Sequence, residues 1–134
     1  MMKTETQIQF FLPMLPPTVT HQMKGIRWET KKFFERPEVA DARAKFTAHL
    51  GAHRPAAPLS GPVRLTTRWI FPLKGKHFDG EYKISRPDTD NSLKLLKDVM
   101  TALDFWTDDA QVASELTEKF WGETPGIFIR VESL

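Results

Sequence analysis

Residues 63–71, VRLTTRWIF, alternate strictly between two kinds of side chain. Successive side chains of a β-strand point to opposite faces, so this alternation predicts a strand with one face in the core and one face in water. The core face would carry Val63, Leu65, Thr67, Trp69 and Phe71, and the other face Arg64, Thr66 and Arg68. This is the clearest strand signal in the chain, and it predicts that the fold contains a sheet.

Weaker patterns predict the remaining elements. Apolar residues at helical spacing predict a helix that begins at Pro37 and ends near Gly51, and a second helix from Ser92 to about Leu103. Alternation predicts strands at residues 6–12, 111–120 and 126–132. The composition of residues 73–86 predicts a basic loop or hairpin, and residues 18–35 show no clear pattern. The order of elements predicts one α+β domain over residues 1–134, with two main helices packed on a mixed or antiparallel sheet.

Several classes of protein are excluded by composition. The sequence has no cysteine, which excludes disulfides and thiolate metal sites. No stretch approaches the roughly 20 apolar residues that span a bilayer. The N-terminal residues MMKTETQIQFF contain neither a long apolar run nor a small-residue cleavage site, so no signal peptide is expected. The default expectation is a cytoplasmic protein, although a chain without cysteine fits any compartment.

Charge is divided unevenly along the chain. Residues 1–87 carry 15 Lys and Arg against 7 Asp and Glu, whereas residues 88–134 carry 4 against 10. A nuclease needs both kinds of surface, because basic groups neutralise phosphates and acidic groups hold divalent cations. The asymmetry alone favours the alternative, in which the charges are scattered over a solvated surface.

Acidic residues gather in the segment RPDTDNSLKLLKDVMTALDFWTDDAQV, residues 86–112. Pro87 favours an extended backbone, and extension would place Asp88 and Asp90 on the same face. Two carboxylates so close repel each other unless a cation lies between them. Asn91 is a good helix N-cap, so the pair would precede a helix N-terminus, where negative charge is stabilised.

Further charged residues flank this pair. Lys94 and Asp98 follow Asp90 at helical spacing, so Lys94 would emerge one turn above the acids; a surface ion pair with Asp98 is the alternative. Asp108 and Asp109 are adjacent, and in an extended loop only one of them would reach a metal. The neighbouring Phe105 and Trp106 predict core anchors, with stacking of Trp106 on a DNA base as the alternative.

Phosphodiester hydrolysis would explain such a set of residues. A bound Mg²⁺ ion lowers the pKa of an attacking water and stabilises the charge that develops on the phosphate oxygens. Mg²⁺ prefers oxygen ligands and usually takes only a few carboxylates. Three aspartates from two segments meet that demand, and Lys94 could bind the scissile phosphate or stabilise the leaving oxygen. Acidic loops that only cap a helix are the structural alternative.

The pattern R-P-D-x-D-N-x-x-K-x-x-x-D-(x)₉-D-D-x-Q-V resembles the signature of the RusA family of Holliday junction resolvases. The resemblance covers about residues 86–119, whereas residues 1–85 match weakly. It implies that Asp88, Asp90 and Asp109 bind the metal, that Lys94 is required for cleavage, and that these four residues form the catalytic set. It gives supporting roles to Asn91, Asp98, Asp108 and Gln111, and Lys119 aligns with a lysine of the family.

The resemblance also implies a substrate and a partner. The substrate would be branched DNA such as a four-way junction, cut by a symmetric homodimer with Mg²⁺, or with Mn²⁺ in its place. Two-fold symmetry suits this task because resolution takes two matched cuts. The basic residues Lys74, Lys76, Lys83, Arg86 and Lys119 would contact DNA, or form a solvated basic surface. The alternative function is a non-catalytic phage accessory protein that binds branched DNA.

Overall fold

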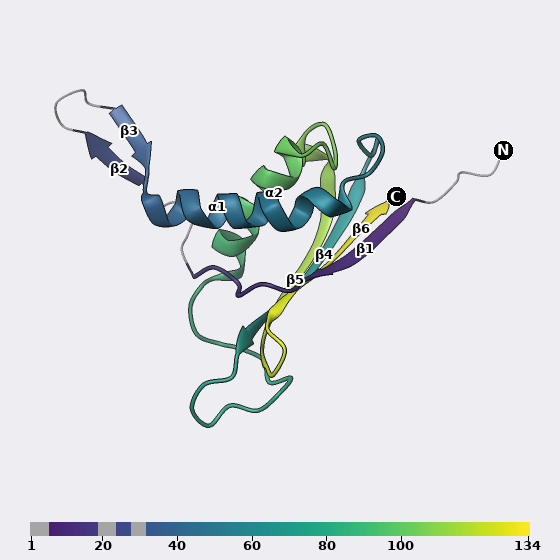
Figure 1. The fold of residues 1–134 in the computed structure, drawn as a ribbon. Helices are drawn as coiled ribbons and strands as arrows, with labels where there is room; N and C mark the ends of the chain where they lie inside the picture. Colours follow the sequence, from purple (N-terminus) through teal and green to yellow (C-terminus); the bar gives the residue numbers. More distant parts are fainter. Residues whose placement is uncertain (1–5, 19–23, 28–31) are drawn as a thin grey trace.

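The computed structural model describes residues 6–18, 24–27 and 32–134, and a four-stranded sheet forms its centre (Figure 1). The strands lie in the order β1-β6-β4-β5. Their bounds are Gln7–Leu12 for β1, Val63–Pro72 for β4, Val112–Gly122 for β5 and Gly126–Ser133 for β6. The pair β4 and β5 is parallel, and the other two pairs are antiparallel. The prediction of an α+β fold with a mixed sheet is therefore confirmed.

Two helices pack on one face of this sheet (Figure 1). Helix α1 spans Pro37–Leu50 and has its proline in the first turn, as predicted. Helix α2 spans Thr89–Ala102, so it begins three residues earlier than the predicted start at Ser92. Its N-cap is Asp88 and not Asn91, because the backbone is extended only as far as Asp88 and turns helical directly after it. The prediction of Asn91 as N-cap was wrong.

The core lies between the sheet and the helices. In β4, the buried side chains include Val63, Leu65, Thr67, Trp69 and Phe71, whereas Arg64 and Arg68 are exposed, as the alternation predicted. Thr66, which was predicted on the water face, is buried as well, so the prediction was wrong for this residue. Phe46 of α1 meets Trp69 edge to face, with ring centroids 6.1 Å apart. Burial of each such aromatic side chain stabilises the fold by about 1.5–3 kcal/mol. Among the described residues, no helix is long and apolar enough to cross a membrane.

The segment before α1 forms a second, smaller sheet. Strands β2 (Lys24–Arg27) and β3 (Lys32–Glu35) pair antiparallel and project from the N-terminal end of α1 (Figure 1). The carboxylate of Glu35 lies 2.8 Å from the guanidinium of Arg43, which ties β3 to the helix. The sequence pattern had left this region without an assignment.

Helix α2 connects the two parallel strands, and this determines where its ends lie. A chain that leaves β4 and enters its parallel neighbour β5 must cross back along the sheet, because both strands run in the same direction. Helix α2 makes this return. Its N-terminus therefore lies at the carboxyl edge of β4 and β5, and its C-terminus lies at their amino edge.

Candidate active site

Asp88 and Asp90 lie at the N-terminus of α2, at the carboxyl edge of the parallel strands. Both are exposed, and Asp88 makes no capping hydrogen bond with its side chain. Asp90 belongs to the first helical turn, so the predicted extended Asp-x-Asp segment was wrong in its second half. Neither carboxylate has a hydrogen bond or ion pair with any residue that the structure describes. The helix dipole stabilises negative charge here, so the position suits two ionised carboxylates that are open to a cation.

Lys94 lies one helical turn beyond Asp90 and is exposed. Residues four apart share one side of a helix, so the ammonium group emerges on the same side of α2 as the Asp90 carboxylate. Asp98 follows one turn later and is half-buried, and Asn91 in the first turn is half-buried too. The arrangement offers two acidic groups and one cation at a solvent-open helix end.

Two further lysines, Lys83 and Lys119, contact the backbone that leads into Asp88. Lys83 Nζ donates to Ser85 Oγ and to the carbonyl of Arg86, at 2.6 Å in both cases. Lys119 Nζ donates to the carbonyls of Ser85 at 2.7 Å and Pro87 at 2.6 Å. Lys83 is only 8% exposed, which leaves little of it to offer to DNA. Burial lowers the pKa of Lys83, and the nearby charges of Lys119 and Lys74 lower that pKa further.

The sequence had placed these two lysines with the surface cations Lys74, Lys76 and Arg86. Those three are exposed, and DNA contact by them stays a prediction. The inward position of Lys119 could have been found from strand alternation, because Lys119 lies two residues before the buried Trp121 and so shares its face of β5. No sequence pattern indicated the burial of Lys83.

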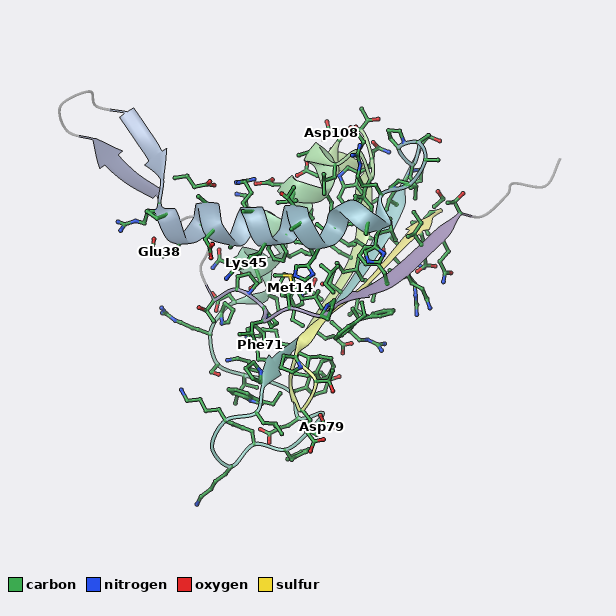
Figure 2. All side chains as sticks on the ribbon, in the orientation of Figure 1. Met14, Glu38, Lys45, Phe71, Asp79 and Asp108 are labelled. Atoms are coloured by element: carbon green, nitrogen blue, oxygen red, sulfur yellow. The ribbon has the colours of Figure 1, made fainter. Side chains whose placement is uncertain are left out.

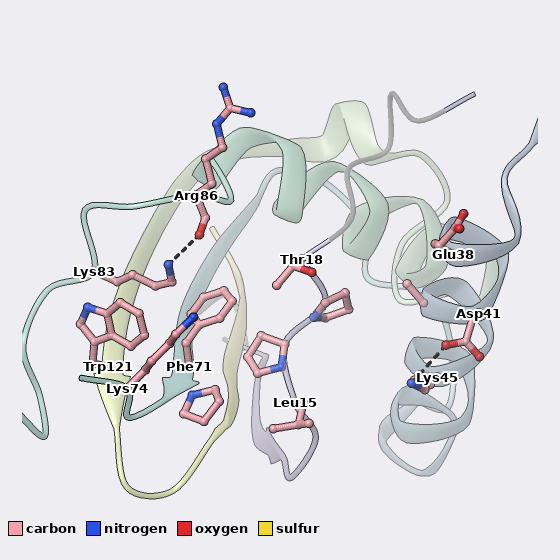
Figure 3. A pocket seen from close by; sticks show the side chains of 14 residues that line it. Leu15, Thr18, Glu38, Asp41, Lys45, Phe71, Lys74, Lys83, Arg86 and Trp121 are labelled. Carbon is pink, nitrogen blue, oxygen red and sulfur yellow. Dashed lines mark hydrogen bonds and ion pairs between the residues drawn. The ribbon is translucent and has the colours of Figure 1, made fainter. Parts of the chain in front are cut away.

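A cavity of about 600 Å³ adjoins the site (Figure 3). Lys74, Lys83 and Arg86 line one side of it, together with Phe71 and Trp121. The opposite side is formed by α1, where Asp41 pairs with Lys45 at 3.1 Å, and by residues 15–18. Its basic side leads toward the acidic end of α2, because Arg86 precedes Asp88 by two residues.

Asp108 and Gln111 build a tight turn at the other end of α2. This 3₁₀ turn, η2 (Asp109–Gln111), stands where the predicted strand was to begin. Asp108 Oδ1 accepts a hydrogen bond from the amide of Ala110 at 2.9 Å. Gln111 Oε1 accepts from the amides of Thr107 and Asp108, and its Nε2 donates to the carbonyls of Leu59 and Gly61. These contacts hold in place the backbone that carries Asp109.

Gln111→Ala should therefore destabilise the fold, by about 2 kcal/mol, because four hydrogen bonds to backbone groups are lost together. The free energy of unfolding in urea measures the change. Gln9→Ala serves as a control on an exposed strand position and should cost less than about 0.5 kcal/mol. Equal effects of the two substitutions would show that the turn gains nothing from the Gln111 contacts.

Asp109 is half-buried, and its carboxylate has no hydrogen bond or ion pair with any described residue. It does not meet Asp88 and Asp90. Helix α2 has 14 residues, which places its two ends about 20 Å apart. Figure 2 shows Asp108 at the far end of the view from Phe71 and Asp79, which lie toward the carboxyl edge. Within the described part of one chain, no three acidic or histidine side chains are grouped to hold a metal.

Phe105 and Trp106, which precede the turn, are fully buried. The indole Nε1 of Trp106 donates to Thr101 Oγ1 at 2.7 Å. The prediction that these rings anchor the loop in the core is confirmed. Stacking of Trp106 on a DNA base is not compatible with its burial.

Comparison with known proteins finds a family and individual relatives. Residues 14–132 match the family described as Endodeoxyribonuclease RusA. The chain is 30% identical over 108 residues to a protein of Lactococcus phage r1t named crossover junction endodeoxyribonuclease rusA, and the match covers 79% of this chain and 81% of the phage protein. It is 26% identical over 93 residues to the uncharacterized protein YqaN of Bacillus subtilis, covering 61% of this chain and 65% of that protein. The family match includes Asp88, Asp90, Lys94 and Asp109.

Proposed function

The chain belongs to the RusA family of endodeoxyribonucleases, and from this premise we propose that it is a metal-dependent, structure-selective endonuclease that resolves Holliday junctions and related branched DNA. The observation that carries the proposal is the exposed pair Asp88 and Asp90 at the N-terminus of α2, with Lys94 one turn away. A domain that only bound DNA would gain nothing from unpaired carboxylates beside a phosphate backbone. The cell compartment would be the cytoplasm of a bacterium or of a phage-infected host, where such junctions arise.

The donor set at this helix end fits Mg²⁺. The ion prefers oxygen ligands and is usually held by one or two carboxylates, with water and substrate phosphates completing its shell. Asp88 and Asp90 supply two such carboxylates in solvent, and Mn²⁺ would suit the same oxygen donors. When bound, the ion would lower the pKa of an attacking water and stabilise negative charge on the phosphate.

The chain's own residues would position the DNA around that centre. Lys94 would bind the scissile phosphate or the leaving oxygen, since its ammonium group emerges on the same side of α2 as Asp90. Exposed cations on the preceding loop, Lys74, Lys76 and Arg86, would hold neighbouring phosphates. Asn91 and Asp98 would support the first turns of the helix, and Asp108 and Gln111 the turn that carries Asp109.

The position of Asp109 is the reason to propose a metal centre that two chains share. Asp109 lies at the amino edge of the parallel strands, and the length of α2, about 20 Å, separates it from the acidic pair at their carboxyl edge. A carboxylate at that distance cannot share an ion with Asp88 and Asp90 of its own chain. If Asp109 is a metal ligand, it serves the acidic pair of a second chain. A two-fold dimer would then contain two such shared sites, as two matched cuts require.

The proposal is tested by incubating the protein with a labelled four-way junction and with a linear duplex of matched sequence, in Mg²⁺, Mn²⁺ or EDTA. We expect paired nicks near the crossover that need the metal ion, while the linear duplex stays intact. Junction that is shifted in a gel but left uncut with either metal would instead favour the non-catalytic accessory protein. If the protein neither binds nor cuts the junction, the acidic segments serve only as structural caps.

A further inference from the structure

Lys83 and Lys119 converge on one short segment, residues 85–87, directly before Asp88. Together their ammonium groups bind three consecutive backbone carbonyls, those of Ser85, Arg86 and Pro87, and also the Ser85 hydroxyl. All four contacts are between 2.6 and 2.7 Å long. Hydrogen bonds from a charged donor are stronger than neutral ones, so the path of this segment is closely determined.

The two lysines are themselves fixed to the sheet. Lys119 belongs to β5, and the amide of Lys83 donates to the carbonyl of Lys119 at 2.9 Å. The Lys83 ammonium lies 4.5 Å from the centre of the Trp121 ring and 5.1 Å from that of Phe71. A buried ammonium group costs free energy unless it is paired and hydrogen-bonded, so packing alone would be served better by an apolar side chain. The arrangement therefore calls for a role beyond filling space.

We propose that Lys83 and Lys119 are positioning residues, which hold residues 85–87 against β5 and thereby fix where Asp88 and Asp90 stand. The Pro87 carbonyl that Lys119 binds belongs to the peptide unit that leads into Asp88. The Asp88 carbonyl in turn accepts the Ser92 amide at 3.2 Å in the first turn of α2. A displacement of residues 85–87 would thus pass directly to both carboxylates. This inference rests on the proposed function, because it assigns the lysines a role in the same site.

Methionine at either position separates positioning from packing. Lys119→Met and Lys83→Met keep an unbranched apolar stem and remove every hydrogen bond from the ammonium group. Lys119→Arg, which can still donate to both carbonyls, is the conservative variant. Lys45→Met on α1 is the control for loss of one exposed lysine to which no role in DNA binding is given. Thermal melting shows which variants fold. If Lys83→Met does not fold, Lys119→Met alone tests the positioning role, because Lys119 is only half-buried.

Two measurements decide the proposal. With saturating junction, the Met variants should nick on the order of 10- to 100-fold more slowly, with junction affinity unchanged, since a misplaced reacting group costs about this much. Hydrogen exchange should accelerate in the peptide that spans residues 84–92 and nowhere else. Lys119→Arg should recover most of the rate and of the protection, and Lys45→Met should change neither.

Other results would overturn the proposal. Met variants with normal exchange in residues 84–92 would show that the lysines do not hold the segment. Weaker junction binding with a smaller salt dependence and an unchanged rate at saturation would make them DNA contacts. Hydrogen exchange needs no nuclease activity, so it tests the positioning role separately from the proposed function. A wild-type protein that cuts no junction would contradict the proposed function, even if the lysines held residues 85–87 in place.

Discussion

Asp90→Asn should slow junction cleavage by a factor of at least about 1,000 and leave junction binding intact or stronger, because it removes one of the two carboxylates that would hold the metal ion. The substitution removes one negative charge and changes the shape of the side chain very little. Asp90 is exposed and has no hydrogen bond or ion pair with any described residue, so the fold should not depend on its charge. Binding can strengthen because one group that repels the DNA phosphates is gone. Single-turnover cleavage and gel-shift titration of the same four-way junction measure the two effects.

A matched control for this variant lies at the opposite end of α2. Asp104 is exposed and has a φ of 62°, a backbone conformation that asparagine adopts readily. Asp104→Asn removes the same charge at the far end of α2 from the acidic pair of its own chain, and with it only an exposed ion pair with Arg54 at 3.8 Å, so cleavage should stay near the wild-type rate. If Asp90→Asn lost binding together with cutting, the residue would be needed for DNA contact or for folding. Retained cleavage would remove Asp90 from the metal centre altogether.

The sequence predicted the sheet well because its core strand carries a strict alternation. Val63, Leu65 and Trp69 had to be buried together once the strand existed, and they are. The start of α2 was harder to predict, since Asp88 and Asn91 are both good N-cap residues and only tertiary contacts decide between them. Those contacts come from Lys83 and Lys119, which fix the backbone directly before Asp88.

The composition of the candidate site was predicted better than its geometry. The spacing of Asp88, Asp90 and Lys94 is local, so one helix end brings them together as soon as α2 forms. The relation of Asp109 to this group depends on the direction in which the chain crosses between β4 and β5. That direction follows from the parallel pairing of two strands 40 residues and more apart, which no local pattern encodes. The hypothesis that all three aspartates converge therefore fails within one chain. It becomes the hypothesis that Asp88 and Asp90 of one chain meet Asp109 of a second chain.

A mixture of two inactive variants tests that statement. Refolding Asp90→Asn together with Asp109→Asn should restore nicking. About a quarter of all sites should be active, because half of the dimers are mixed and each mixed dimer has one intact site out of two. In such a dimer, one site combines both substitutions. The other site combines the unaltered Asp88 and Asp90 of one chain with the unaltered Asp109 of its partner. The product should be a junction nicked in one strand, since only one site per dimer can cut.

The control mixture pairs Asp90→Asn with Asp88→Asn. These two residues lie at the same helix end, so each site of a mixed dimer keeps one substitution and no activity should return. Recovery in the first mixture and not in the second requires that Asp109 act across the dimer, because a site within one chain stays inactive in both. One variant of each mixture is labelled with ¹⁵N, so that mixed dimers can be recognised by their intermediate mass. No recovery in either mixture, with mixed dimers present, would remove Asp109 from the shared centre and leave the acidic pair of each chain to hold the ion alone.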